Sequence, residues 1–351
     1  GCVGGGTGWE PRPLVAIENG RLVAAAPLYL KQHSEGEFVF DWGWADAAER
    51  AGIPYYPKLL VGVPFTPATG ARLLVAEGED RAVWTERLAA ALLELCQSND
   101  LSGVHVNFCR EDEIAPLRAQ GFELRVGVQY HWRNAGYAVF DDWLARFRSK
   151  RRNQIKRERR GVAEAGVEIE TLAGEEIPDD LFEPMFRFYL STVRTRVWGR
   201  QYLNRRFFAL LRERYKKRLC FVVARVGGEP IAGTFNVQKG DTLWGRYWGA
   251  TREVRNLHFE VCYYAAVERC IAAGLSRFEP GAGGDYKQMR GFDGEPTWSL
   301  HWLAEPRLRA AWREFAESRT ALAALAAVAI LIGLALLAPW VAPQNPYDLG
   351  Q

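Results

Sequence analysis

The sequence lacks the short motifs of several common enzyme classes. It contains no G-x-S-x-G, no G-x-x-x-x-G-K-[ST] and no C-x-x-C segment, which counts against serine hydrolases, P-loop NTPases and zinc enzymes. Its five histidines are scattered along the chain, so we expect no metal site. The six cysteines form no close pair, which favours free thiols in a reducing compartment over a disulfide framework.

The chain also lacks a strong overall charge. Its formal net charge of +3 is too small to indicate wholesale nucleic-acid binding, so an electrostatic partner has to be sought in local clusters. The 351 residues, 48% of them hydrophobic and 25% charged, suffice for two packed domains. The first ten residues carry neither a signal peptide nor an initiator Met, so we expect a truncated N-terminus.

Long hydrophobic runs are scarce except near the C-terminus. Residues 321–338 are uncharged and mostly apolar, which predicts a transmembrane helix. Arginines precede this run and no Lys or Arg follows it, which places the rest of the chain on the cytoplasmic side of the inner (plasma) membrane. The alternative is a buried C-terminal helix, which needs apolar partners all round.

Two segments of the chain resemble each other. Residues 14–25 (LVAIENGRLVAA) and 222–233 (VVARVGGEPIAG) align, and each predicts a β-hairpin, with Asn19-Gly20 and Gly227-Gly228 in the turns. A helix, a short strand and a Gly-Phe pair follow each hairpin. This pattern indicates a duplicated α/β unit.

The spacing of apolar residues predicts the elements between and within these units. We expect helices over 82–96, 141–165, 181–193, 202–215 and 259–273, and strands over 101–108, 167–171, 220–226, 231–237, 242–249 and 275–280.

A run of basic residues is the strongest local signal. At i, i+4 spacing, one helix face presents like charges that repel one another unless an anion relieves them. The run therefore predicts a site for a phosphate, a pyrophosphate or an RNA backbone, and the alternative is a solvated helix face. The candidate ligands are Arg148, Lys150, Arg152, Asn153 and Lys156.

A glycine-rich turn over 279–292 (EPGAGGDYKQMRGF) is the next candidate. Glycines after a strand allow the backbone to approach a ligand closely, and Lys287 and Arg290 follow on the next turn. Such cations stabilise the oxyanion that forms when an amine attacks an ester or thioester. Glu279 and Asp285 are candidate bases, and a purely structural turn is the alternative.

An aromatic, Pro-rich loop over 55–67 and an aromatic strand supply further candidates. Tyr56 and Lys58 lie in the loop, and Arg246 lies on the strand 242–249, where it is expected to line a cleft. Rigid loops of this kind form ligand walls, although they also cover cores.

Several stretches taken together resemble FemAB-like proteins, the bacterial peptidoglycan biosynthesis/recognition family. These stretches are ARVGGEPIAG, LWGRYWGA, HFEVCYYAAVERCIAAGL, FEPGAGGDYKQMRGF, FRSKRRNQIKRERR and YYPKLLVGVPFTPATG, and the resemblance covers roughly residues 3–303. It implies an α/β (α+β) fold of two tandem GNAT-like lobes of the Fem type. The expected parts are a first, incomplete lobe over 1–140, linking helices over 141–216, a second lobe over 217–305 and the tail over 306–351.

The resemblance also implies a function. Fem enzymes transfer amino acids from aminoacyl-tRNA to the peptide of a cell-wall precursor, so we expect an acyl- or aminoacyltransferase acting on an amine. The implied donor is aminoacyl-tRNA or acyl-CoA, with no tightly bound cofactor, no metal and no DNA. The Phe-Lys pair of Fem enzymes corresponds best to Tyr286-Lys287 here, although the aromatic residue differs. The candidate catalytic residues are these two together with Arg290 from the same glycine-rich turn. The alternative is a non-catalytic module that recognises phosphates or cell-wall precursors.

The tail has a separate resemblance. Residues 317–351 (ESRTALAALAAVAILIGLALLAPWVAPQNPYDLGQ) resemble the N-terminal membrane segment of dipeptide-type ABC transporter permeases. This resemblance indicates a fusion of neighbouring reading frames, and it leaves a permease fragment as a further alternative.

Overall fold

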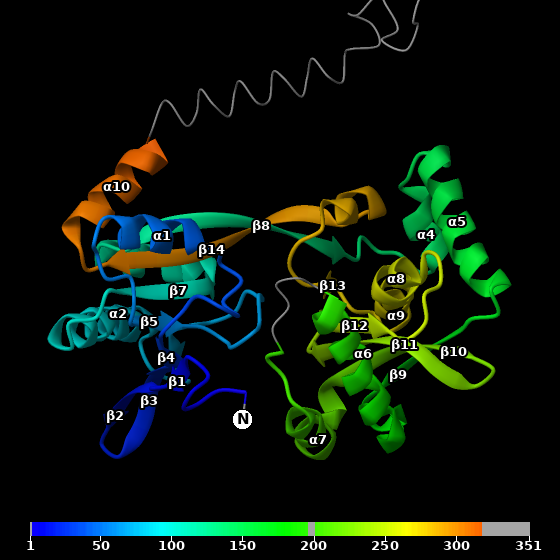
Figure 1. Ribbon diagram of the computed structural model, residues 1–351, viewed down its shortest axis with the longest axis horizontal. Coiled ribbons are helices and arrows are strands. Elements are labelled where there is room, and N and C mark those ends of the chain that lie inside the picture. The colour runs from blue at the N-terminus through cyan, green and yellow to red at the C-terminus, as the bar shows by residue number, and fades with distance from the viewer. Residues whose placement is uncertain (1, 196–200, 318–351) are drawn as a thin grey trace, which may run out of the picture.

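One eleven-stranded sheet runs through two lobes that lie side by side (Figure 1). The computed structural model describes residues 2–195 and 201–317. The strand order is β1-β4-β5-β7-β14-β8-β13-β12-β11-β10-β9. The strands are β1 (Trp9–Pro11), β4 (Leu28–Lys31), β5 (Lys58–Val61), β7 (Gly103–Cys109), β8 (Glu123–Arg133), β9 (Glu168–Ala173), β10 (Leu219–Val226), β11 (Glu229–Lys239), β12 (Thr242–Ala250), β13 (Arg277–Glu279) and β14 (Asp293–Leu303).

The last strand of the chain joins the sheet of the first lobe. Strand β14 pairs antiparallel with β7 and with β8, so that Leu300 lies between Val106 and Leu124. Strand β8 in turn pairs with β13 of the second lobe. The segment 217–305 therefore includes a strand that lies within the first-lobe sheet, and the two lobes share their central strands.

Both expected hairpins are present. In the first, β2 (Leu14–Glu18) and β3 (Arg21–Ala26) form a small sheet with β6 (Leu74–Val75). Asn19 and Gly20 adopt φ angles of 52° and 76°, and Gly227 and Gly228 in the β10–β11 turn adopt 57° and 80°. Each lobe also contains one parallel strand pair, β5–β7 and β12–β13. These matching features confirm the duplicated α/β unit that the sequence indicates.

The helices match the expected segments closely, with two differences. The stretch 141–165 is broken in two, because Arg148 adopts an extended ψ of 150°. The stretch 259–273 contains a π-turn, η5 (Glu260–Tyr264). The α-helices are α1 (Trp42–Arg50), α2 (Arg81–Ser98), α3 (Ile114–Ala119), α4 (Phe140–Ala145), α5 (Ser149–Glu164), α6 (Phe182–Thr195), α7 (Arg205–Arg214), α8 (Leu257–Phe259), α9 (Ala265–Ala272) and α10 (Pro306–Glu317), and the 3₁₀ turns are η1 (Glu111–Glu113), η2 (Gly174–Glu176), η3 (Asp179–Leu181), η4 (Lys216–Arg218) and η6 (Asp285–Arg290).

Helix α6 lies directly against strand β12. A Cβ atom at Gly249 would lie 1.7 Å from the carbonyl oxygen of Phe188, so the two backbones meet at a position that admits only glycine. The helix buries an aromatic cluster against the sheet, including Phe186, Tyr189 and Phe235. This close approach brings one face of α6 to the edge of the pocket described below.

Helix α10 packs on the first lobe. The ring of Trp312 lies 4.7 Å from that of Trp44 and 5.3 Å from that of His301, between centroids. Within residues 2–195 and 201–317, no helix is long and apolar enough to cross a membrane. The predicted transmembrane helix 321–338 and the permease-like tail lie outside the described residues.

Candidate active site

A pocket opens where two parallel strands separate. Strands β12 and β13 pair only as far as Trp244 and Glu279. Just beyond these residues Gly245, Arg246, Pro280 and Gly281 line a cavity of about 370 Å³, which is within the range of small-molecule sites. The glycine is needed here, because a Cβ at Gly245 would come within 3.1 Å of Pro280 Cα.

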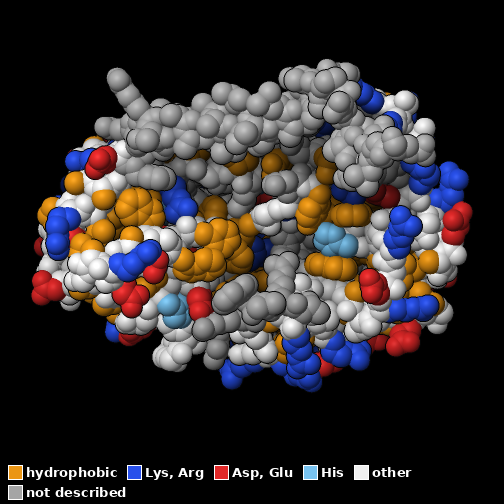
Figure 2. Space-filling model, turned by 45° about the horizontal axis from the view of Figure 1, so that its top comes forward, with side chains coloured by type: hydrophobic (Ala, Val, Ile, Leu, Met, Phe, Trp, Pro, Cys, Tyr) orange, Lys and Arg blue, Asp and Glu red, His pale blue; other side chains and the backbone are white. Residues whose placement is uncertain are grey.

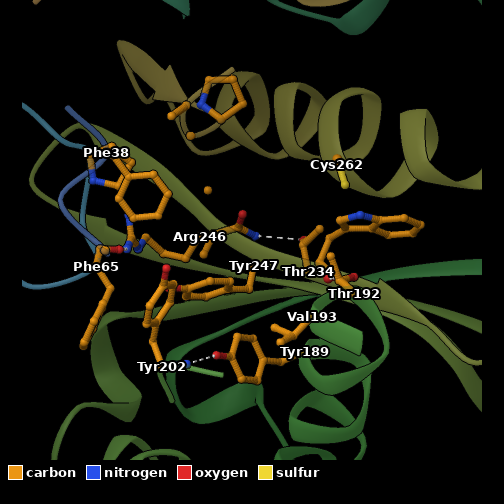
Figure 3. A pocket seen from close by; sticks show the side chains of 18 of the residues that line it. Phe38, Phe65, Tyr189, Thr192, Val193, Tyr202, Thr234, Arg246, Tyr247 and Cys262 are labelled. Carbon is orange, nitrogen blue, oxygen red and sulfur yellow. Dashed lines mark hydrogen bonds between the residues drawn. The ribbon is translucent and has the colours of Figure 1, made fainter. Parts of the chain in front are cut away.

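The walls of the pocket are mainly aromatic and come from both lobes (Figure 3). The rings of Tyr189 and Tyr247 meet edge to face with centroids 4.9 Å apart, and Phe65 stacks on Tyr202 at 4.8 Å. On the face of the molecule that Figure 2 shows, hydrophobic side chains lie on both sides of the middle. Many Lys and Arg side chains lie toward the lower and right-hand edges of that view. The aromatic lining residues are Phe38, Phe40, Trp42, Phe65, Tyr189, Tyr202, Tyr247, Trp248, Tyr263 and Tyr286.

Lys287 brings a buried ammonium group to this pocket. The residue is 2% exposed, and its Nζ donates a hydrogen bond of 2.6 Å to the carbonyl of Gly281. Burial lowers the pKa of Lys287 to about 8, and no carboxylate pairs with it among the described side chains. At neutral pH the group is therefore mainly protonated and is free to donate to an anionic ligand atom.

Arg246 is the second cation of the pocket. Its guanidinium donates to the carbonyl of Phe65 and, at 3.1 Å, to Thr66 Oγ1, which ties β12 to the first-lobe loop. Burial lowers the pKa of Arg246, although the group stays charged because guanidinium is so strong a base. Two donors are used in these bonds, which leaves others for a ligand.

The π-turn of the α8–α9 helix and the neighbouring Tyr286 complete the pocket. Tyr286 is 37% exposed, and its hydroxyl lies 3.3 Å from that of Tyr263. Burial raises the pKa values of Tyr263 and of the pocket residue Cys262. The thiol is therefore protonated and is not activated as a nucleophile.

Arg290 does not face the pocket, in contrast to the sequence-based expectation. Its guanidinium is 5% exposed and bonds Glu158 on α5 at 3.2 Å and the Tyr264 hydroxyl at 3.1 Å. It also lies 3.4 Å from the centroid of the Phe259 ring. These partners make Arg290 a link between η6 and α5, and the expectation that it stabilises a reacting oxyanion is corrected.

The basic helix does not converge on Lys287 either. The helix α8–α9 stands between α5 and the pocket, because it presents Cys262 and Tyr263 to the pocket while Glu260 and Glu268 bond Arg159 of α5. The expected ligands on α5 and just before it lie outside the pocket lining, and Lys156 pairs with Asp141 at 3.4 Å. The residues concerned are Arg148, Lys150, Arg152, Asn153 and Lys156.

Lys58 lies in a buried charge cluster of the first lobe instead of contacting a phosphate. Its Nζ is 2.6 Å from Asp41 Oδ2, 3.1 Å from Glu37 Oε2 and 2.8 Å from Ser34 Oγ. Burial opposes its charge, but Glu37 and Asp41 outweigh this effect and raise the pKa of Lys58. Tyr56 bonds Ser34 at 2.7 Å. The buried Lys58 is occupied by these partners, so the expectation that it binds a phosphate is corrected. Tyr56 lies outside the lining of the aromatic pocket, and its expected role stays a prediction.

The same cluster contains a group of side chains of the metal-ligating type. Glu37, Asp41 and His105 offer ligand atoms within 4.8 Å of one another. The Lys58 ammonium contacts all three residues, with His105 Nδ1 at 3.4 Å. Because this ammonium already supplies the positive charge, the geometry describes a buried ion-pair network better than a metal site.

The candidate base Glu279 does not line the pocket. Glu279 is buried outside the lining and pairs with Arg277 at 2.9 Å. Burial raises the pKa of Glu279 despite that partner. The side chain of Asp285 lies outside the described part of the structure.

Two α/β lobes joined through one continuous sheet give this chain a fold of the tandem GNAT-like kind. Three solved structures share this arrangement. The crystal structure of FemX matches with a TM-score of 0.53 at 11% identity, covering 87% of this chain and 90% of that chain. L-PGS from Bacillus licheniformis matches at 0.52 and 7% identity, covering 81% and 82%. The C-terminal domain of a putative lysylphosphatidylglycerol synthetase from Agrobacterium fabrum matches at 0.54 and 11%, covering 83% and 84%.

The family follows from the sequence as well as from the fold. Residues 1–330 match the FemAB-like family, described as peptidoglycan biosynthesis/recognition, and the chain belongs to that family. Among curated proteins, none matches this sequence.

Proposed function

We propose that this protein is an aminoacyltransferase that moves an aminoacyl group from an ester donor onto an amine. The observation that carries the proposal is the position of Lys287, a buried ammonium group with no carboxylate partner among the described residues, in the pocket beyond the end of the β12–β13 pairing. A desolvated, preorganised cation is what a developing oxyanion requires. Membership of the FemAB-like family and the fold shared with FemX support the same reaction class.

In the proposed reaction the lone pair of the amine attacks the ester carbonyl, and a C–N bond forms. The carbonyl oxygen becomes an oxyanion, to which Lys287 Nζ donates. The tetrahedral intermediate then collapses, the C–O bond of the ester breaks, and the proton lost by the amine ends on the departing alkoxide as an alcohol. Positioning of the two substrates supplies much of the acceleration, and the aromatic walls exclude the water that would otherwise hydrolyse the ester.

The donor proposed here is aminoacyl-tRNA. The cations of α5 lie behind the α8–α9 helix and outside the pocket lining. They do not contact an ester in the pocket, but a tRNA is long enough to place its ester there and its backbone on α5. Arg148, Lys150, Arg152, Asn153 and Lys156 are assigned this backbone contact in the proposal, and Tyr286 is assigned to the pocket wall.

The test is a transfer assay with tRNA charged with a mixture of radiolabelled amino acids. Cell-wall precursor peptides serve as amine acceptors, and phosphatidylglycerol vesicles represent the lipid acceptor that the names of two relatives suggest. Labelled peptide product with wild-type protein, at least a hundredfold less with Lys287→Met and unchanged product with the exposed control Lys217→Met support the proposal. Product that forms with acyl-CoA and not with aminoacyl-tRNA would show that acyl-CoA is the donor. Binding without product in every combination would indicate a recognition module.

A further inference from the structure

The charged side chains among the described residues that line the pocket are all cations. Among its described lining residues, none is Asp or Glu, whereas Arg246 and Lys287 are both present. The hydrogen bonds of these two cations go to uncharged oxygens, those of Phe65, Thr66 and Gly281. The field that these two side chains produce inside the pocket is therefore positive.

The part of the pocket next to α6 is mostly apolar or aromatic, although Thr192 also lines it. Val193 and Tyr189 project from the helix, and Tyr247 lies over them from β12 (Figure 3). Tyr202 closes the same side, with its backbone N–H bonded to the Tyr189 hydroxyl at 2.9 Å. A side chain that enters this part exchanges water for ring and methyl surface, which favours apolar groups.

Together these observations bear on which amino acid the pocket accepts. An ammonium or guanidinium group placed here would lose its hydration, would find no carboxylate among the described lining residues and would meet two cations of like sign. The aromatic rings attract cations, but they act against the repulsion of Arg246 and Lys287. An uncharged apolar side chain meets none of these costs.

We propose that the group transferred carries an uncharged, apolar or aromatic side chain, and that the pocket excludes lysyl and arginyl groups. This inference rests on the proposed function and specifies its substrate. It separates this chain from a relative whose name states a lysyl group.

The experiment measures binding of stable donor analogues to the full chain. The probes are 3′-amino-3′-deoxyadenosine 5′-phosphates that carry phenylalanine, leucine or lysine through an amide bond, with the unacylated nucleotide as reference. We expect the phenylalanyl and leucyl analogues to bind at least tenfold more tightly than the lysyl analogue. Equal or tighter lysyl binding overturns the inference and leaves the proposed function intact. If no analogue binds better than the bare nucleotide, the aminoacyl donor itself is wrong.

A charge introduced at Val193 provides the matched comparison. Val193 is partly buried and lines the pocket from α6. Val193→Glu supplies the missing carboxylate, and Val193→Gln has nearly the same shape without the charge. We expect Val193→Glu to bind the lysyl analogue at least tenfold more tightly than Val193→Gln does. The leucyl analogue is expected to bind Val193→Glu equally well or more weakly than Val193→Gln. Equal lysyl affinity in the two variants overturns the electrostatic argument, and circular dichroism establishes that both are folded.

Discussion

Lys287 and Arg290 stand three residues apart on η6, and their side chains bond to different parts of the fold. The Lys287 ammonium lies in the pocket, where it bonds the Gly281 carbonyl, whereas the Arg290 guanidinium bonds Glu158 of α5. One turn of chain therefore supplies both the cation proposed to act in catalysis and the ion pair that fixes the turn to the helix behind it. The predictions below treat the two residues separately.

Lys287→Met is expected to stabilise the fold while removing activity. Burial lowers the pKa of Lys287 to about 8, below its unfolded value, so the charged form costs the folded state free energy. Replacement by Met raises the free energy of unfolding at pH 7 by about 1–3 kcal/mol, at 1.36 kcal/mol for each pKa unit. Urea unfolding at pH 7 and pH 10 measures this. The unfolded chain binds the extra proton between these values, so the advantage shrinks toward pH 10. A variant less stable than wild type at pH 7 contradicts the prediction.

The transfer rate is expected to fall as pH rises through about 8, where Lys287 loses its proton. A neutral amine donates more weakly to an oxyanion than an ammonium does. Hydroxylamine is a suitable acceptor, because it is unprotonated throughout this range and contributes no titration of its own. A transfer rate that stays level from pH 7 to 10 would show that hydrogen-bond donors other than Lys287 stabilise the oxyanion.

Arg290→Met is expected to destabilise the protein by about 3–5 kcal/mol, since it leaves the Glu158 carboxylate buried without its charge partner. Glu158→Gln has a similar effect for the reciprocal reason. The double variant is expected to recover part of the loss, because neither charge then remains unpaired. Guanidinium unfolding of the four proteins measures the coupling. Additive losses would show that the pair at 3.2 Å does not act as a unit.

Lys58→Met is expected to lower the free energy of unfolding by about 3–5 kcal/mol. The change leaves the buried Glu37 and Asp41 carboxyl groups next to each other without the ammonium group that contacts both. Burial already raises the pKa of Glu37 to about 7, so the folded protein holds a proton there that the unfolded chain releases. Stability from this group accordingly falls as pH rises from about 4.5 to 7. Thermal melts across this range measure both effects, and Lys58→Met/Asp41→Asn is expected to melt higher than the single variant. If Lys58→Met is as stable as wild type, the charge cluster does not contribute to the stability of the fold.

Gly249→Ala is expected to lower stability by about 3 kcal/mol or more, because the new Cβ would lie 1.7 Å from the Phe188 carbonyl oxygen. Gly161→Ala is the matched control. It lies on α5 with nothing within 4 Å of the new Cβ, and the change is expected to stabilise the helix by roughly 1 kcal/mol. Differential scanning calorimetry of both variants and wild type measures these effects. Equal melting temperatures for Gly249→Ala and wild type would show that α6 does not pack directly against Gly249.

Local patterns in the sequence account for most of the elements. The β10–β11–β12 meander and the two hairpins follow from β-prone runs bounded by glycine pairs, and α6 and α7 follow from their apolar spacing. The glycine-rich turn also pointed to Lys287. The aromatic lining escaped notice because Tyr189 and Val193 have the spacing of an ordinary core-facing helix, and their spacing carries no sign of a pocket.

The direction in which charged side chains face was decided by pairings between distant segments. Arg290 is turned from the pocket by Glu158, 132 positions away along the chain, and Lys58 is drawn inward by carboxylates of another loop. The insertion of β14 between β7 and β8 likewise depends on contacts that no local period records. The sequence by itself determined the elements, the duplication and the candidate turn, since these rest on neighbouring residues. Tertiary structure alone decided which cations reach the pocket, because burial and pairing of charge depend on what lies across the fold.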